Sequence, residues 1–429
     1  MSESNQFGDD DNPFGGMQFF IGDLAKMLEQ QGPMSWDAAR QLALNIATEG
    51  KPEANIEPVE RMKVEQLARV AELQVADVTG LSTSVAGAGV GIAPVNRSQW
   101  VTASLDAYRP LFEKLSSSLA GVMESQLEEL DEADISDPAG ALGSDPMGLL
   151  GNIMKMLGPM MLGMTAGSMV GHLATRVFGQ YDLPIPRPPS DELMVVVANL
   201  DPFGEEWSLP PDDLRLWVCI HEITHHALLG VPHVRQRLED LVSSYVSGFT
   251  SDPSGLEERL GDINPMDPTS IQGLQEAMGD PEVLLGAIQS DEQRALVPQL
   301  DALLMAIGGY VDWVLDNVGE RLLASYGMVT EALRRRRVET DASSRFVERL
   351  FGLELTQEKF DRGSAFVEGV IERAGTDGLA LLWESAENLP TPAEIDAAGL
   401  WLARIGAADG LPELDEAPDI PDTPDFGDD

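Results

Sequence analysis

Hydrophobic positions recur along most of the chain at the three- to four-residue spacing of amphipathic helices. This pattern predicts a mainly α fold in which helices supply most of the core. The expected helices cover residues 35–47, 58–78, 99–127, 147–174, 210–230, 233–249, 297–323, 340–351, 357–374 and 392–405.

Local signals mark some of these boundaries. Ser35 is a typical N-cap residue, and Thr391-Pro-Ala-Glu394 has the form of a capping box. A small β element is expected at Leu193 to Ala198, which is short, apolar and rich in valine. The stretches 82–94 and 128–146 are predicted to be a loop and an acidic linker.

The composition divides the chain into four regions. Residues 1–18 and 406–429 are rich in acidic residues with Gly or Pro, so we predict disordered acidic tails. Between them we expect an N-terminal helical region at 19–146 and a catalytic region at 147–405.

One methionine- and glycine-rich segment, residues 147–174, could be mistaken for a membrane span. Lys155 and Pro159 interrupt it, whereas a span needs about 20 predominantly apolar residues. Gly163, Gly167 and Gly171 repeat at four-residue spacing, which lets a neighbouring helix approach closely. The segment is therefore predicted to be a buried, closely packed helix.

The charge balance limits the partners. The chain has 72 acidic and 28 basic residues, a formal net charge of −44, which disfavours nucleic acid and anionic membranes. The four-arginine run at 334–337 would cover all faces of a helix, so we expect internal salt bridges there. With one cysteine, Cys219, and no apolar leader at the start, a cytoplasmic protein is expected; the oligomeric state is unconstrained.

The strongest chemical signal is the sequence His-Glu-Ile-Thr-His-His at residues 221–226. On a helix, His221 and His225 leave the same face and can bind one zinc ion, while Glu222 can act as general base on a zinc-bound water. The flanking residues are apolar, and burying these polar groups without a partner would be costly. A chance match with merely hydrogen-bonded histidines is the alternative.

The third ligand is the weak point of this prediction. Leu228 and Val231 stand where a metzincin needs Gly and His, so that class is excluded. His226 points to a different face, and His233 is expected at a helix start. The remaining candidates are carboxylates on predicted helices, namely Glu239, Asp240, Asp312, Asp316 and Glu320.

Several segments together resemble the bacterial zincin-like metallopeptidase type 2 family, which is widespread in actinobacteria and has members described as associated with coenzyme F420 biosynthesis. The resemblance covers roughly residues 30–405. Its segments are Trp217–His225, Gly309–Asp312, Gly363–Val370, Leu389–Ile395 and Trp401–Arg404.

The resemblance implies a zincin-like architecture whose active-site helix carries the motif, with zinc as cofactor and a peptide or protein as substrate. In the family a Glu often precedes the Gly-Tyr pair, where this chain has Gly308. Asp312, one turn further on, is then the candidate third ligand, and Tyr310 a candidate oxyanion donor. Two functions follow: a gluzincin-like zinc peptidase, or a catalytically impaired zincin fold that binds or regulates.

Overall fold

The computed structural model describes residues 34–84, 87, 89–133, 146–249, 290–338 and 342–407. These residues form a mainly α fold with a two-stranded parallel sheet, which confirms the predicted fold class. The predicted tails at 1–18 and, from residue 408 on, at the other end lie outside the described residues.

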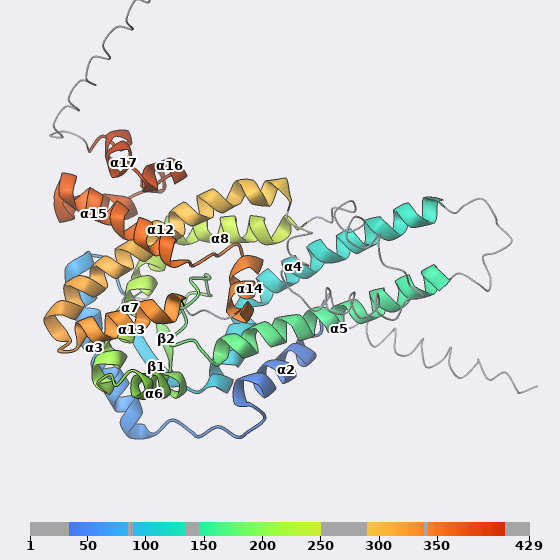
Figure 1. The fold of residues 1–429 in the computed structure, drawn as a ribbon, viewed down its shortest axis with the longest axis horizontal. Helices are drawn as coiled ribbons and strands as arrows, with labels where there is room; N and C mark the ends of the chain where they lie inside the picture. Colours follow the sequence, from blue (N-terminus) through green and yellow to red (C-terminus); the bar gives the residue numbers. More distant parts are fainter. Residues whose placement is uncertain are drawn as a thin grey trace, which may run out of the picture.

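The helices and strands follow the chain in the order of Figure 1. The strands are β1 (Gly91–Val95) and β2 (Glu192–Val196). The helices are α2 (Trp36–Thr48), α3 (Pro58–Thr79), α4 (Arg97–Ala133), α5 (Pro146–Ala174), α6 (Val197–Glu206), α7 (Pro211–Gly230), α8 (Pro232–Ser247), α12 (Asp291–Leu322), α13 (Tyr326–Val338), α14 (Ala342–Leu350), α15 (Gln357–Ala380), α16 (Pro392–Ile395) and α17 (Ala398–Arg404).

The predicted loop at 82–94 is wrong in its last part, where β1 begins at Gly91 and pairs in register with β2. The sequence of β1 is Gly-Ile-Ala-Pro-Val, which lacks a run of β-branched residues. Its pairing partner lies about a hundred residues away, so no local pattern could reveal this strand. The predicted linker at 128–146 is also wrong in its first part, because α4 continues to Ala133.

Two boundaries near the predicted elements differ as well. The strand expected to reach Ala198 ends at Val196, and the unpredicted helix α6 follows at once. The helix expected at 392–405 is two helices, α16 and α17, separated at Asp396 and Ala397. The capping box is confirmed, since the Thr391 N–H donates to Glu394 Oε2 at 2.8 Å.

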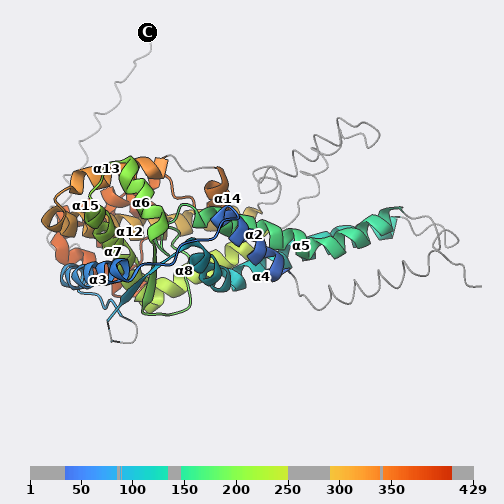
Figure 2. The same cartoon turned by 90° about the horizontal axis from the view of Figure 1, so that it is seen from below.

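Two long helices, α4 and α5, project from the helical body, and α2 lies along α5 (Figures 1 and 2). The glycine stripe of α5 makes this contact possible. A β-carbon at Gly163 or Gly167 would overlap the backbone of Ser35 or Ala39 on α2, which confirms the predicted close packing. Among the described residues, no helix is long and apolar enough to cross a membrane.

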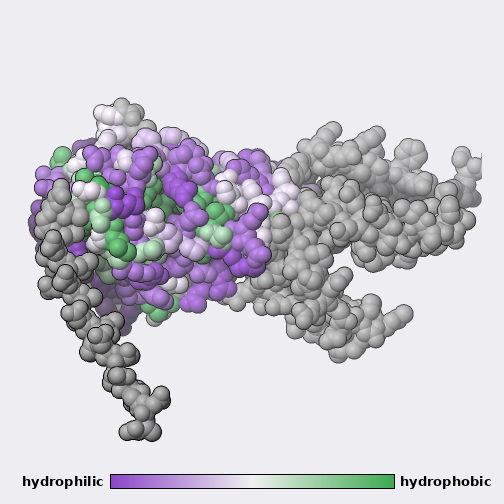
Figure 3. Space-filling model, turned by 90° about the horizontal axis from the view of Figure 1, so that it is seen from above, coloured by the Kyte–Doolittle hydropathy of each residue, from purple (hydrophilic) through white to green (hydrophobic). Residues whose placement is uncertain are grey.

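Helix α7 lies inside the body and contacts α3, α12, α8, α6, α13 and β2. Nearly all of its side chains are buried, as expected for a helix that is apolar around most of its circumference. Hydrophilic residues cover most of the face shown in Figure 3, with smaller hydrophobic areas between them. Because α7 is largely buried and contacts these other elements, the helix predicted to carry the motif is the central helix of the fold.

Candidate functional site

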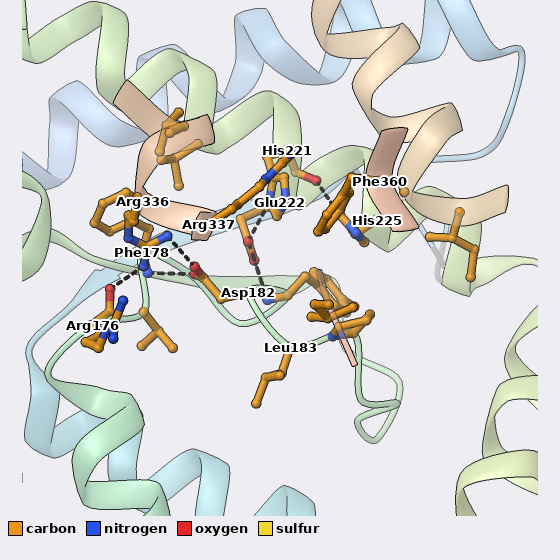
Figure 4. Close-up of a pocket in the computed structure, with 18 of the residues that line it drawn as sticks. Arg176, Phe178, Asp182, Leu183, His221, Glu222, His225, Arg336, Arg337 and Phe360 are labelled. Atoms are coloured by element: carbon orange, nitrogen blue, oxygen red, sulfur yellow. Dashed lines mark hydrogen bonds and ion pairs between the residues drawn. The ribbon is translucent and has the colours of Figure 1, made fainter. Parts of the chain in front are cut away.

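The motif lies in the second half of α7, which begins with Pro211 and two acidic residues and ends at Gly230. Proline at the first position and acidic residues in the first turn favour this start. From α7, the side chains of His221, Glu222 and His225 line a pocket with a volume of about 140 Å³. Its other walls come from α12, α13, α14, the start of α15 and residues 173–184 (Figure 4).

The two histidines lie side by side in this pocket, as their spacing predicted. Their ring centroids are 4.3 Å apart. Nδ1 of His225 lies 3.1 Å from the carbonyl oxygen of His221, and Nδ1 of His221 lies 3.1 Å from Oε1 of Glu222. Each ring therefore keeps its Nε2 for another ligand.

Glu222 is fully buried, and backbone groups of the preceding loop hold its carboxyl group. Oε2 accepts hydrogen bonds from the N–H groups of Gln180 at 2.8 Å and Tyr181 at 3.0 Å. The loop comes this close because residue 179 is glycine, where an added β-carbon would overlap the Glu222 carboxyl group. An isolated bridge between Gly179 and Val195 fixes the loop against β2.

Burial sets the protonation of all three groups. It lowers the pKa of His221 to about 4 and, with help from the neighbouring His221, the pKa of His225 to about 3. Burial, together with the charge of the nearby Asp182, raises the pKa of Glu222 to about 8. The imidazoles are thus neutral, the form that binds metals, and Glu222 is poised to exchange a proton near neutral pH.

Two arginines of α13 reach into the same pocket. Arg336 pairs with Asp182 at 3.1 Å and lies over the Phe178 ring at 3.8 Å. Arg337 pairs with Asp312 at 3.0 Å and lies over the Phe360 ring at 4.1 Å. The prediction of internal salt bridges for this arginine run is confirmed, and two of its positive charges lie beside the histidine pair.

The part of the pocket lining that α12 contributes carries no ligand for a metal. Helix α12 presents Leu304, Ile307 and Gly308 to the pocket. A β-carbon at Gly308 would stand 3.2 Å from the ring of Phe360, which also lines the pocket. A side chain at position 308 would therefore require the Phe360 ring to shift.

The structure does not bring the predicted Asp312 and Tyr310 into the pocket lining. Both oxygens of Asp312 accept hydrogen bonds from Arg337, at 3.0 and 3.3 Å. Tyr310 is buried between Trp313 and Trp383, with ring centroids 5.3 and 5.2 Å away, and burial raises its pKa. In this arrangement Asp312 is a counter-ion and Tyr310 a core residue.

The other histidines and candidate carboxylates also lie elsewhere. His226 faces Tyr181, with Nδ1 3.1 Å from the phenol oxygen, and His233 lies in the first turn of α8, both as predicted. Glu239 pairs with Arg235, and Asp240 accepts from Gln236. None of the four carboxylates Glu239, Asp240, Asp316 and Glu320 lines the pocket.

These observations test whether the residues fit a catalytic zinc ion, which needs three protein ligands and one open position. His221 and His225 supply two nitrogen donors. Within the described part of the chain, no group of three or more His, Cys, Asp or Glu has the geometry to hold a metal. Backbone N–H groups bind Glu222, and Arg336 and Arg337 pair with Asp182 and Asp312. Glu348 also lines the pocket but forms no such group with the two histidines, so the residues described do not fit a zinc centre.

Several pocket residues could not be predicted from the sequence. Asp182, Glu348 and Phe360 belong to different segments, and only the folded chain brings them to the histidines. Burial raises the pKa of Glu348 to about 7, which marks it as a second acidic group able to titrate in this pocket. An isolated acidic residue in a helical pattern carries no local signal of such burial.

Comparison with known proteins agrees with this architecture. A family model described as zincin-like metallopeptidase matches residues 34–402. A solved structure from Chloroflexus aurantiacus, described as "a putative hydrolase with a novel fold", is 24% identical with a TM-score of 0.59. The match covers 87% of this chain and 99% of that chain, and at this identity it shows the fold alone. No curated protein matches.

Proposed function

Because the chain belongs to the zincin-like metallopeptidase family, a family of hydrolases, we propose that it keeps that family's fold and pocket but acts as a binding or regulatory protein. The observation that carries this proposal is that α12 brings Gly308, packed against the Phe360 ring, and no metal ligand to the pocket of the histidine pair. The partner would be a peptide or protein, as expected for this family.

The electrostatics of the pocket support the same proposal. Arg336 and Arg337 both line it, and each of them holds a carboxylate that would otherwise be available to a divalent cation. Their partners Asp182 and Asp312 are already used in ion pairs.

A zinc-dependent hydrolase is the second candidate, with Glu222 as its general base. The pair of neutral imidazoles and the raised pKa of Glu222 favour it. It would need a third donor, and the described residues hold no group of three or more His, Cys, Asp or Glu that could bind a metal. The resemblance also implied a role connected with coenzyme F420. No residue that lines this pocket supports that role.

The decisive experiment is a zinc measurement on the purified full-length chain after dialysis against zinc and then against buffer. We expect a content far below one zinc per chain, unchanged in His225→Ala. One zinc per chain that is lost in His225→Ala would overturn the proposal in favour of the second candidate. Circular dichroism on both proteins separates loss of zinc from loss of fold.

A peptide-library digest tests the activity directly. We expect no cleavage that differs between the natural chain and Glu222→Gln, which keeps the shape of the side chain and removes its acid–base function. Cleavage that disappears in Glu222→Gln would establish a hydrolase. A pull-down with the same peptides immobilised would then ask whether the pocket binds what it does not cut.

A further inference from the structure

A second cavity lies between α4 and α8, over the segment Pro186–Pro188, with a volume of about 320 Å³. It shares no lining residue with the histidine pocket. Ala107, Leu111 and Val242 give it apolar walls, and Lys114, Arg187 and Arg235 line it as well. We refer to it below as the Arg187 groove.

Arg187 is the unusual member of this groove, because it is only 8% exposed and no carboxylate pairs with it within the described residues. Its Nη2 donates to the hydroxyl oxygens of Ser104 at 2.8 Å and Tyr108 at 3.0 Å. The guanidinium lies 4.9 Å from the Tyr108 ring centre and 5.6 Å from that of Trp100, and its Nε has no hydrogen-bond partner.

Neutral hydroxyl groups and aromatic rings stabilise a guanidinium, but they do not neutralise it. A buried charge is unfavourable unless a charge of opposite sign pairs with it. An anion bound in the groove would supply what the Arg187 side chain lacks in the free protein.

The remaining charges of the groove favour the same kind of ligand. Arg235 donates to Glu239 at 2.8 Å and to the carbonyl oxygen of Arg187, and Lys114 donates to Ser243. Three basic groups and one acidic group thus line a groove in a chain with a formal charge of −44. This local excess of positive charge is complementary to an anion.

We propose that the Arg187 groove binds a small monocarboxylate with an aliphatic body, with Arg187 as the counter-ion. A guanidinium binds a carboxylate through strong, charge-assisted hydrogen bonds. The apolar walls suit the aliphatic part, and the volume lies at the lower end of the roughly 300–1,000 Å³ typical of small-molecule sites. Glu239 beside Arg235 disfavours a ligand with two negative charges.

Two sources could supply this chemistry: a free aliphatic acid or the C-terminal carboxylate of a peptide. Calorimetry on the full chain distinguishes them with octanoate, with an acetylated tripeptide ending in leucine, and with the amides of both. Binding of octanoate alone indicates an aliphatic acid, and binding of the tripeptide indicates a chain terminus. The proposal is overturned if neither acid binds at millimolar concentration, or if the amides bind equally well.

Variants connect the binding to the groove. Arg187→Met keeps an apolar side chain against Trp100 and Tyr108, and it should weaken binding about tenfold or more, the effect of losing a charge-assisted hydrogen bond. Lys51→Gln, which removes one exposed positive charge elsewhere, should bind like the natural chain. Equal binding by natural chain and Arg187→Met would contradict the proposal.

A thermal-shift measurement shows whether each variant is folded. The bound acid should raise the melting temperature of the natural chain and of Lys51→Gln, because a ligand stabilises the state that binds it. If Arg187→Met does not fold, Lys114→Met at the same groove replaces it, with an expected loss of a few-fold in affinity. Unchanged affinity in Lys114→Met would then overturn the proposal.

Discussion

The ring of Phe360 lies 3.2 Å from the position that a β-carbon on Gly308 would take. Gly308 belongs to α12 and Phe360 to the first turn of α15, and both line the pocket of His221 and His225. This contact closes the side of the pocket from which α12 could supply a ligand. It also indicates which two substitutions could add a third ligand to the histidine pair.

We expect that Gly308→Glu combined with Phe360→Ala creates a zinc site that the natural chain lacks. The first change adds a carboxylate facing the two imidazoles, and the second removes the ring that would block it. The measurement is zinc per chain after dialysis, with zinc affinity from competition with a chelator. The double variant should retain close to one zinc, which His225→Ala should abolish.

The single variants are the controls for this design. Gly308→Glu alone meets the Phe360 ring, and Phe360→Ala alone supplies no ligand, so neither should retain zinc. Phe360→Ala should also lower the free energy of unfolding, by less than the roughly 3–5 kcal/mol of a fully buried Phe, because Phe360 is only partly buried. If the natural chain retains as much zinc as the double variant, the role assigned to Phe360 is wrong.

The motif itself could be predicted from the sequence because it depends on local spacing. Proline and acidic residues mark the start of α7, and the four-residue interval brings His221 and His225 together wherever the helix lies. The same local logic identified the capping box at Thr391 and the glycine stripe of α5. In each case the evidence lies within one helix.

The surroundings of the motif depend on contacts between distant segments, and these could not be predicted. The sequence correctly predicts a salt bridge for Arg337. It does not identify Asp312 as the partner, because the same sequence suggests Asp312 as a metal ligand. Strand β1 was missed because only its pairing with β2 stabilises it. The sequence thus revealed which residues carry the chemistry but not what faces them.

The ion pair of Asp312 and Arg337 can be used to test whether Asp312 is a counter-ion or a metal ligand. The side chains are 24% and 18% exposed, so removing one partner takes an ion pair away from a largely buried charge. We expect Asp312→Asn to lower the free energy of unfolding by about 1–3 kcal/mol. Chemical denaturation measures this, and the double variant with Arg337→Met should recover part of the loss.

A metal ligand would behave differently from a counter-ion. If Asp312 binds zinc, Asp312→Asn should lower the zinc content, and Arg337→Met should raise it by freeing the carboxylate. We expect neither change in zinc content. A fall in zinc with unchanged stability would assign Asp312 to the metal after all.

The contact between Gly179 and Glu222 can be tested by substituting each residue alone and both together. Gly179→Ala places a β-carbon on the Glu222 carboxyl group and should lower the free energy of unfolding by about 1–3 kcal/mol. In a Glu222→Ala background the overlap disappears, so Gly179→Ala should then have little effect. A double-mutant cycle measures the difference, and strictly additive effects would contradict this contact.

The packing of α2 on α5 predicts an unusual response to alanine. In an exposed helix, Gly→Ala stabilises by up to about 1 kcal/mol, but Gly167→Ala should destabilise because its β-carbon overlaps the Ala39 backbone. Gly327 in α13 is the matched control, since nothing lies within 4 Å of its added β-carbon. Thermal unfolding of the two variants should therefore shift in opposite directions.

The buried Glu348 predicts a specific pH dependence of stability. Burial raises its pKa to about 7, above an unfolded value of about 4.3, so between these values the folded chain holds a proton that the unfolded chain releases. Stability therefore falls as the pH rises from about 4.3 to 7, and the loss is complete above pH 7. Glu348→Gln removes this loss.

The measurement is urea denaturation of the natural chain and Glu348→Gln at pH 5 and at pH 8. The variant should gain about 2 kcal/mol relative to the natural chain between the two values, and Glu368→Gln controls for the loss of an exposed acidic charge. The histidines of the motif are common to both proteins, so their titration cancels in the difference. A difference that does not change with pH would mean that Glu348 ionises in the folded pocket as it does in the unfolded chain.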